Sequence, residues 1–436
     1  MPRLRPMLHG YGSESNGLGL LSGSMSFVTA PEWFDTSMMD TLSQPLAIPS
    51  DPNTAILFSP DEVASLLDAR SESQQPASLP RSLDLEAFAA EPNEALPSKS
   101  RINGPTHWMS LLGKYNQHGL FDHVVHVLFQ GEGHPGIQKC KQLAREVKSR
   151  VVDPTSLSGP LQDFMPSREI CDELIRLYLQ TFEAVLRVLH VPSLQRDYLR
   201  YWSNPQAASE PLTLQLLLIM AIGTCFYHDI GATEPTLHIQ AAHWIRACHL
   251  RLAVPCRKKD VNLRGIQSQC LLAIALLTNT NTLGGDLVWT TTASLVQNAM
   301  RIGLHISPGQ FSVTPLDSEI RRRLWVTILE LAVQSSLDSC NNPIISTDAL
   351  KCEHPSNLND IQINDSIETL PAGYPATTFT QSSMQRALLE SLPIRLRIVE
   401  ALRQAQGELS YATALRLGAE LTDACRDTSK LMDTFL

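Results

Sequence analysis

Three arginines and a tryptophan form the stretch of this chain best suited to chemistry. Arg321, Arg322, Arg323 and Trp325 lie near the start of "EIRRRLWVTILELAVQSSL", residues 319–337. Guanidinium groups bind phosphates and carboxylates, so three interpretations are open: a contact with nucleic acid, part of an active site, or the beginning of a buried helix. On a helix the three arginines span about 200° of the circumference and cannot share one flat face. This favours a buried helix with Trp325 in the core and partner carboxylates near its positive N-terminal end.

Motifs of catalysis and metal binding are not found in the sequence. It contains no Gly-x-Ser-x-Gly, Walker loop, Gly-x-Gly-x-x-Gly or His-Glu-x-x-His pattern, and no aspartate-rich helix. Zinc needs closely spaced thiolates and imidazoles. The two nearest groups are Cys248-His249 with His243, and Cys352-Glu353-His354. We interpret the first group as part of a buried helix and the second as an ordinary loop, so no catalytic residue, metal ligand or cofactor is predicted.

Charge is distributed unevenly along the chain. The 436 residues carry a formal charge of −9, and residues 1–100 alone hold five basic and thirteen acidic side chains. The remainder is therefore nearly neutral and lacks the basic surface expected of a duplex-DNA binder. No DNA-contacting residue is predicted. The run Arg257-Lys258-Lys259 reads as a solvated patch, with a weak nuclear-import signal as the alternative.

The cysteines and the apolar runs indicate where in the cell the protein is expected. The nine cysteines are scattered, odd in number and without a Cys-x-x-Cys pair, which is typical of reduced thiols in a cytosolic or nuclear protein. The most apolar run, Leu214 to Ile222, is far shorter than the roughly 20 residues that a membrane span needs. No membrane association is predicted.

Residues 1–100 differ in composition from the rest. Ser, Pro, Gly, Asn and Gln surround short acidic and apolar islands such as "PEWFDTSMMDTL" (31–42) and "DEVASLLDA" (61–69). Such a segment buries too little apolar surface to fold alone, so we predict disorder. The alternation of acidic and apolar residues is typical of activation segments that fold on a partner. An inert solvated tail is the alternative.

Helical periodicity dominates from residue 101 onward. In "SREICDELIRLYLQTFEAVLRVLH" (167–190), apolar residues recur at steps of three and four, and Pro192 is expected to end the helix. The predicted fold class is all-α: a multi-helix bundle or array with a disordered N-terminal segment. Residues 101–165 are predicted as a linker with short helices, and residues 166–436 as one helical domain. Further helices are expected at about 212–227, 236–253, 263–278, 286–304, 316–339, 381–403 and 409–434.

Four separated blocks carry a family pattern. The succession resembles the signature of the fungal-specific transcription factor domain, the middle homology region of fungal regulators, over about residues 170–365. The resemblance implies that these residues are structural. The blocks supply Tyr178, Phe182, His190 and Pro192; the stretch 266–277; Arg301, Gly303, Leu304 and His305; and Arg321, Arg322, Arg323, Leu324 and Trp325 followed by Pro343, Pro355, Asn357 and Asp360.

Departures from the family pattern lead to two further expectations. Ala332 replaces an acid, and Cys340-Asn341-Asn342 replaces a Gly-Arg-Pro turn. The first cysteine is Cys140, so we expect this chain to lack the zinc DNA-binding module that most family members carry. Members usually continue well past the point equivalent to Leu436, so truncation of the domain at its C-terminus is also expected.

The resemblance implies a transcriptional regulator that acts through protein contacts and controls a metabolic gene set. Expected partners are other transcription factors or co-regulators, with DNA reached only indirectly or through a missing module, and a homo- or heterodimer is a further expectation. The expected location is the nucleus, shared or not with the cytoplasm. One alternative is a truncated or degenerate relative that serves as a helical scaffold or dominant-negative partner. An unrecognised all-α enzyme is the other.

Overall fold

The computed structural model describes most of the chain beyond residue 133, together with two short segments before it. The acidic segment predicted to be disordered lies outside the described residues except for its last few positions, as do the basic run 257–259 and the turn 340–342. The described residues are 96–98, 101–103, 134–150, 159–227, 236–253, 261–279, 283, 286–339, 343–404 and 409–435.

The fold class is all-α, as predicted. A two-stranded antiparallel ribbon, β1 (Leu96–Ser98) and β2 (Arg101–Asn103), is the one β element in the described part of the chain and was not predicted. No helix among the described residues is both long and apolar enough to span a membrane. The helices are α5 (His134–Arg150), α6 (Arg168–Tyr178), α7 (Ala184–Leu186), α8 (Val191–Ser203), α9 (Glu210–Gly223), α10 (Thr236–Ala253), α11 (Leu263–Thr278), α13 (Asp286–Arg301), α14 (Pro315–Ser339), α15 (Ser383–Gln404) and α16 (Tyr411–Asp433).

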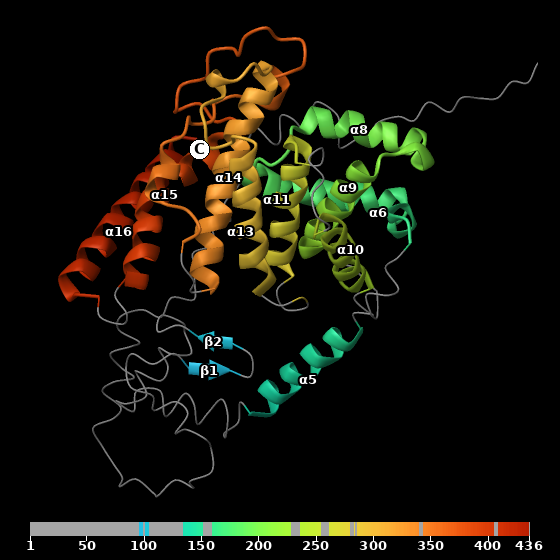
Figure 1. Ribbon diagram of the computed structural model, residues 1–436, viewed down its shortest axis with the longest axis horizontal. Helices are drawn as coiled ribbons and strands as arrows, with labels where there is room; N and C mark the ends of the chain where they lie inside the picture. Colours follow the sequence, from blue (N-terminus) through green and yellow to red (C-terminus); the bar gives the residue numbers. More distant parts are fainter. Residues whose placement is uncertain are drawn as a thin grey trace, which may run out of the picture.

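The helices pack as an array. Helix α9 contacts α6, α10 and α11, and from α11 the packing passes through α13, α14 and α15 to α16. Figure 1 shows these last helices standing side by side, with α16 at the opposite end from α6 and α10. One continuous core joins α6 to α15.

Helix α9 is buried on every side because its sequence is apolar all round. Each residue from Leu212 to Gly223 is buried. Its last residue, Gly223, lies so close to α6 that a Cβ atom there would stand 2.1 Å from the carbonyl oxygen of Leu174. The close approach of two helix backbones therefore requires glycine at this position.

The helix predicted over 167–190 is interrupted. Helix α6 passes into a π-helical turn at Leu179–Glu183, and α7 then ends at Leu186. Arg187 adopts a left-handed conformation with φ 53°, which reverses the chain. Pro192 lies in the first turn of α8, where its fixed φ suits a helix start. The prediction that Pro192 ends a helix was wrong in this respect, and α8 was not predicted.

The last three helices, α14, α15 and α16, differ in how far they are buried. Helix α14 is buried along most of its length, as its wide apolar band predicted, and α15 continues through an internal proline, Pro393. In α16 only Leu417 is buried, and Tyr411 and Leu415 are 78% and 56% exposed. The array thus ends in a helix that covers α15 on one side and faces solvent on the other.

Candidate functional site

Two of the three arginines of α14 are half-buried and bind different neighbours. The Arg321 guanidinium donates to the carbonyl oxygen of Ile302 at 3.1 Å and lies 5.7 Å from the ring centre of Phe311. Arg322 donates to Glu353 at 2.9 Å. Both side chains are half-buried, and each is directed to a separate part of the fold.

Arg323 is buried. It donates to Glu319 at 3.0 Å, to Asp360 at 2.6 Å and to the carbonyl oxygen of Leu358 at 3.2 Å. Glu319 also accepts from Arg322 at 3.1 Å. The expected partner carboxylates are therefore present, and the arginine row forms neither an open cleft nor a common basic face.

The rest of this motif block lies in the core or close to it. Leu324 and Trp325 are 0% and 1% exposed, and the Trp325 indole N–H donates to the carbonyl oxygen of Ala349 at 3.2 Å. The ring of His305 lies 6.1 Å from that of Trp325. His305 itself and Arg301 are exposed.

Asp360 is the centre of a buried charge network. Its carboxylate accepts from the guanidinium groups of Arg187 and Arg323 and, at 2.9 Å, from the backbone N–H of Val191 at the start of α8. Its carbonyl oxygen lies 3.0 Å from Nε2 of His190. Burial alone would raise the pKa of Asp360, but the charges of Arg187, Arg323 and His190 hold it well below its ordinary value.

Glu183 is the second buried carboxylate of the network. It accepts from the Tyr178 hydroxyl at 2.7 Å and from the backbone N–H of Leu189 at 2.9 Å, whereas the Arg187 guanidinium lies 3.8 Å away. Burial raises the pKa of Glu183 to about 7, and the charge of Arg187 offsets only part of that rise. Glu183 therefore takes up a proton near neutral pH.

The network contains more buried carboxylates than buried guanidinium groups. Three carboxylates and two guanidinium groups each have a side chain no more than 3% exposed. A surplus acid in such surroundings holds a proton more tightly than in water. Because solvent does not reach these groups, they form a closed structural cluster, unlike a catalytic site that must admit a substrate. The members are Glu183, Glu319, Asp360, Arg187 and Arg323.

Asn357 fixes the loop that follows the network. Its amide nitrogen donates to the carbonyl oxygens of Tyr374, Pro375 and Thr378 at 3.3, 2.9 and 3.0 Å, and its amide oxygen accepts from the Thr380 hydroxyl at 2.6 Å. One buried side chain thus ties together several backbone groups of the loop.

Gln385 joins α15 to the same region. Its amide nitrogen donates to the carbonyl oxygens of Leu186 and Arg323 at 2.9 and 2.8 Å and to the Thr327 hydroxyl at 3.0 Å. The side chain therefore bridges α7, α14 and α15 at the point where α7 ends. Neither Gln385 nor the loop contacts of Asn357 were predicted.

Gly303 ends α13. Its φ is +76°, and its N–H donates to Met300 while that of Leu304 donates to Ala299, at 2.9 and 3.0 Å. This is the Schellman arrangement, which favours glycine at the left-handed position. A Cβ atom at Gly303 would also lie 2.8 Å from the Phe311 ring.

The remaining motif residues have local roles. The carbonyl oxygen of buried Pro355 accepts from Arg386. Phe182, in the π-helical turn, is half-buried with its ring 6.0 Å from that of Phe226. Pro343 is half-buried. Of the predicted motif residues, the structure brings His190, Arg323 and Asp360 into direct contact.

Besides Glu319, the predicted motif set omitted two more members of the network, Glu183 and Arg187. They stand four residues apart within an apolar helix, which is itself a signal because charged residues at core positions need partners. The π-helical turn adds a residue to the helix and turns Glu183 into the core. Phe182 and Val185, predicted on the buried stripe, are half-buried instead.

The thiol and imidazole groups considered for zinc lie on α10 and in the loop after α14. Cys248 is buried, and its thiol donates to the carbonyl oxygen of Leu214 at 3.8 Å. Burial raises the pKa of the Cys248 thiol far above its ordinary value. Over the described ranges, no three His, Cys, Asp or Glu side chains are arranged to hold a metal ion.

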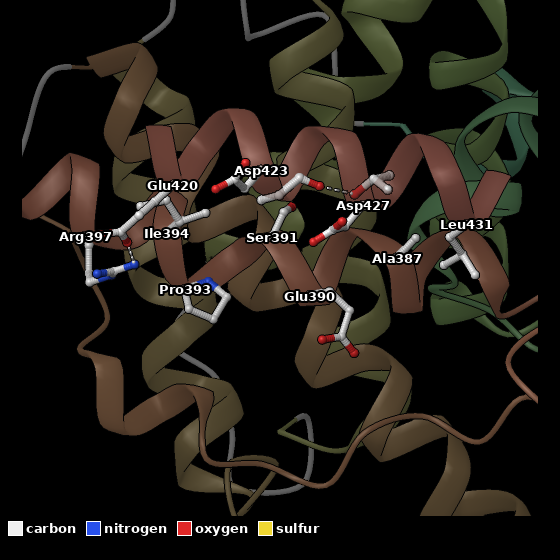
Figure 2. Close-up of a pocket in the computed structure, with 12 residues that line it drawn as sticks. Ala387, Glu390, Ser391, Pro393, Ile394, Arg397, Glu420, Asp423, Asp427 and Leu431 are labelled. Atoms are coloured by element: carbon white, nitrogen blue, oxygen red, sulfur yellow. Dashed lines mark hydrogen bonds and ion pairs between the residues drawn. The ribbon is translucent and has the colours of Figure 1, made fainter. Parts of the chain in front are cut away.

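A groove of about 490 Å³ lies between α15 and α16. Figure 2 shows acidic side chains along α16 facing α15 across it, with Arg397 paired to Glu420 near one end. Unlike the buried network, this groove is open to solvent and can receive another molecule. Its apolar lining residues are Ala387, Pro393, Ile394, Ala424 and Leu431, and its acidic ones are Glu390, Glu420, Asp423 and Asp427.

Comparison with known proteins identifies the domain. The fungal specific transcription factor domain matches residues 175–391, which include most of the described array. No solved structure matches the chain.

Relatives from fungi support the same family. The chain is 40% identical to transcription factor opdR of Penicillium oxalicum over 349 residues, which cover 78% of this chain and 43% of opdR. It is 36% identical to transcription factor asR3 of Sarocladium schorii, with 70% and 37% covered, and 37% identical to the aspyridones cluster regulator apdR of Emericella nidulans, with 54% and 32% covered. The chain thus spans less than half the length of these relatives. They are transcription factors and regulators, not enzymes, and the chain belongs to the fungal-specific transcription factor family.

Proposed function

We propose that this chain is a transcriptional regulator that works in the nucleus through protein contacts made by its helical domain. The observation that carries the proposal is the closure of the charge network. The motif residues Arg323, His190 and Asp360 bind one another inside the fold, so they act by holding the array together. The surfaces left for function are then the exposed helices and the groove between α15 and α16.

The gene set is proposed from the relatives. One of them bears the name of a metabolite cluster regulator, and we propose that this chain likewise controls a set of metabolic genes. In this proposal the acidic segment 1–100 contacts co-regulators, and promoters are reached through a partner or through a DNA-binding module outside these 436 residues. The scaffold or dominant-negative role is the second candidate, favoured by the replacement at Cys340-Asn341-Asn342.

Transcript profiling tests the proposal. Deletion and overexpression of the gene should change the abundance of transcripts from a limited set of metabolic genes in opposite directions. Residues 1–100 fused to a foreign DNA-binding module should activate a reporter, and replacing the acids of 61–69 by their amides should reduce that activation. Unchanged transcripts would contradict the regulatory role, whereas a silent fusion alone would contradict only the role of the acidic segment. A dominant-negative partner would instead lower the same transcripts on overexpression.

A further inference from the structure

Helix α5 has an apolar stripe that the structure leaves at the surface. Ile137, Cys140 and Leu143 fall within about 120° of the helix circumference. Cys140 and Leu143 are exposed, Leu143 to 45%, and Ile137 is half-buried. An amphipathic helix of this kind gains stability when a partner covers its stripe.

Basic side chains border that stripe on both sides. At 100° per residue, Lys139 lies next to Leu143 on one edge, whereas Lys141 and Arg145 follow Ile137 on the other. All three are exposed. The surface that fits α5 is therefore an apolar groove with acidic edges.

The groove between α15 and α16 has this character. Ile394 and Leu431 contribute to its apolar lining, and Glu390 stands on the α15 side. Three acids, Glu420, Asp423 and Asp427, recur along α16 at steps of three and four (Figure 2). They therefore present an acidic edge to a helix lying in the groove.

The acids of this edge already have partners, but weak ones. Asp423 lies 2.5 Å from Arg426 and Asp427 lies 3.2 Å from Lys430, with all four side chains more than half exposed. Exposed pairs of this type contribute little to stability. Exchanging them for the bases of a docked helix is therefore inexpensive.

We propose that the α15–α16 groove binds α5 of a second copy of this chain, so that two copies form a reciprocal dimer. The apolar stripe of α5 covers the groove floor, its bases face the acids of α16, and the same contact occurs twice across the two-fold axis.

The length of the chain that follows α5 favours binding of α5 to the groove of a second copy over binding to the groove of the same copy. Gly159, the first described residue after α5, is held by Arg251 of α10 at 3.0 Å, at the end of the array opposite α16 (Figure 1). The chain from Arg150 to Gly159 spans at most about 30 Å. In the side-by-side array, α11 and α14 stand between α10 and α15, and with helix axes 8–10 Å apart the three steps are roughly 24–30 Å. Helix α5 of the same copy would therefore need an almost fully extended connection to enter the groove, whereas α5 of a second copy needs none.

Sedimentation analysis of the full chain with charge-reversed variants tests the proposal. The triple variant Lys139→Glu/Lys141→Glu/Arg145→Glu and the double variant Asp423→Lys/Asp427→Lys should each raise the dissociation constant of the dimer at least about tenfold. Combining the two sets restores opposite charges and should recover most of the affinity. The control Arg196→Glu/Arg200→Glu/Lys351→Glu makes the same charge change at exposed sites elsewhere and should leave the dimer intact.

Covalent trapping gives a second measurement. In a Cys425→Ser background, Ala424→Cys places a thiol on the groove side of α16. Mild oxidation should then link it to Cys140 of the other copy, giving a dimer that disappears when Cys140→Ser is added. A chain that stays monomeric at all concentrations overturns the proposal. So does a dimer whose dissociation constant is unchanged by both charge reversals.

Discussion

Two regions of the helical array use charged residues in opposite ways. Where α7, α8, α14 and the loop after α14 meet, Arg187, Arg323 and Asp360 are buried and bind one another. Between α15 and α16, acids such as Asp423 and Asp427 are 66% and 74% exposed. Charges withdrawn from water need partners in fixed positions, whereas exposed charges keep their solvation and exchange partners at small cost. The first region therefore maintains the fold, and the second is available to other molecules.

Removing the central carboxylate should have the largest effect. Asp360→Ala leaves Arg187 and Arg323 buried without their partner, and we expect a loss of about 3–5 kcal/mol in the free energy of unfolding. Urea denaturation followed by circular dichroism measures it. Asp365→Ala is the matched control, because its pair with Arg196 is exposed and should contribute at most about 1 kcal/mol. Similar losses for both variants would remove the distinction between buried and exposed charges.

Protonation of Glu183 should make stability depend on pH. Its raised pKa means that the folded state binds this proton more tightly than the unfolded state. Its contribution is thus complete below pH 4.5 and is lost as pH rises toward 7, by roughly 3 kcal/mol. The lowered pKa of Asp360 acts in the other direction, with stability lost as pH falls below 3.8.

The free energy of unfolding between pH 4 and 8, measured for the parent chain and for Glu183→Gln, checks this pattern. The variant should show a flatter profile from pH 4.5 to 7. A profile that declines equally in both proteins would assign the pH dependence to another group.

Two glycine substitutions should change stability in opposite directions. Gly303→Ala meets both a left-handed backbone and the Phe311 ring, so a loss of about 1–2 kcal/mol is expected. At Gly418, inside α16, a Cβ atom meets nothing within 4 Å, and Gly418→Ala should stabilise by about 0.5–1 kcal/mol. Thermal unfolding of the two variants in parallel measures both, and the same sign for both would contradict the packing described.

Substitutions on the groove should have the smallest effect on folding. Asp423→Asn and Asp427→Asn remove exposed charges only, and each should change the free energy of unfolding by less than about 0.5 kcal/mol. Chemical denaturation at two salt concentrations measures it. A loss above 2 kcal/mol would show that this region, too, maintains the fold.

The periodicity of apolar residues predicted the helices but not the turn that builds the network. The apolar stripe up to Tyr178 correctly indicated a helix with a buried face, and the apolar band around Trp325 correctly indicated a buried helix. A rule of 3.6 residues per turn cannot detect a π-helical turn, so Phe182 was placed in the core in preference to Glu183. The left-handed conformation of Arg187 was missed for a different reason. It is stabilised by an ion pair with Asp360, a residue far away in the sequence.

Distances in sequence explain what else was missed. Glu319 and Arg323 are four residues apart on one helix, so spacing alone accounts for their pair. The contacts of Gln385 with Leu186 span 199 residues and depend on the packing of α15 against α7. Side chains whose partners are set by tertiary packing leave no periodic signal in the sequence.

A double-mutant cycle on Arg323 and Asp360 tests the central claim most directly, namely that the motif residues act by binding one another inside the fold. Arg323→Met and Asp360→Leu should each destabilise strongly because each strands a buried charge. The double variant should lose clearly less than the sum of the two, with a coupling of at least about 1 kcal/mol in the free energy of unfolding. Additive losses, or single variants that fold normally but lose the binding of another molecule, would contradict this account.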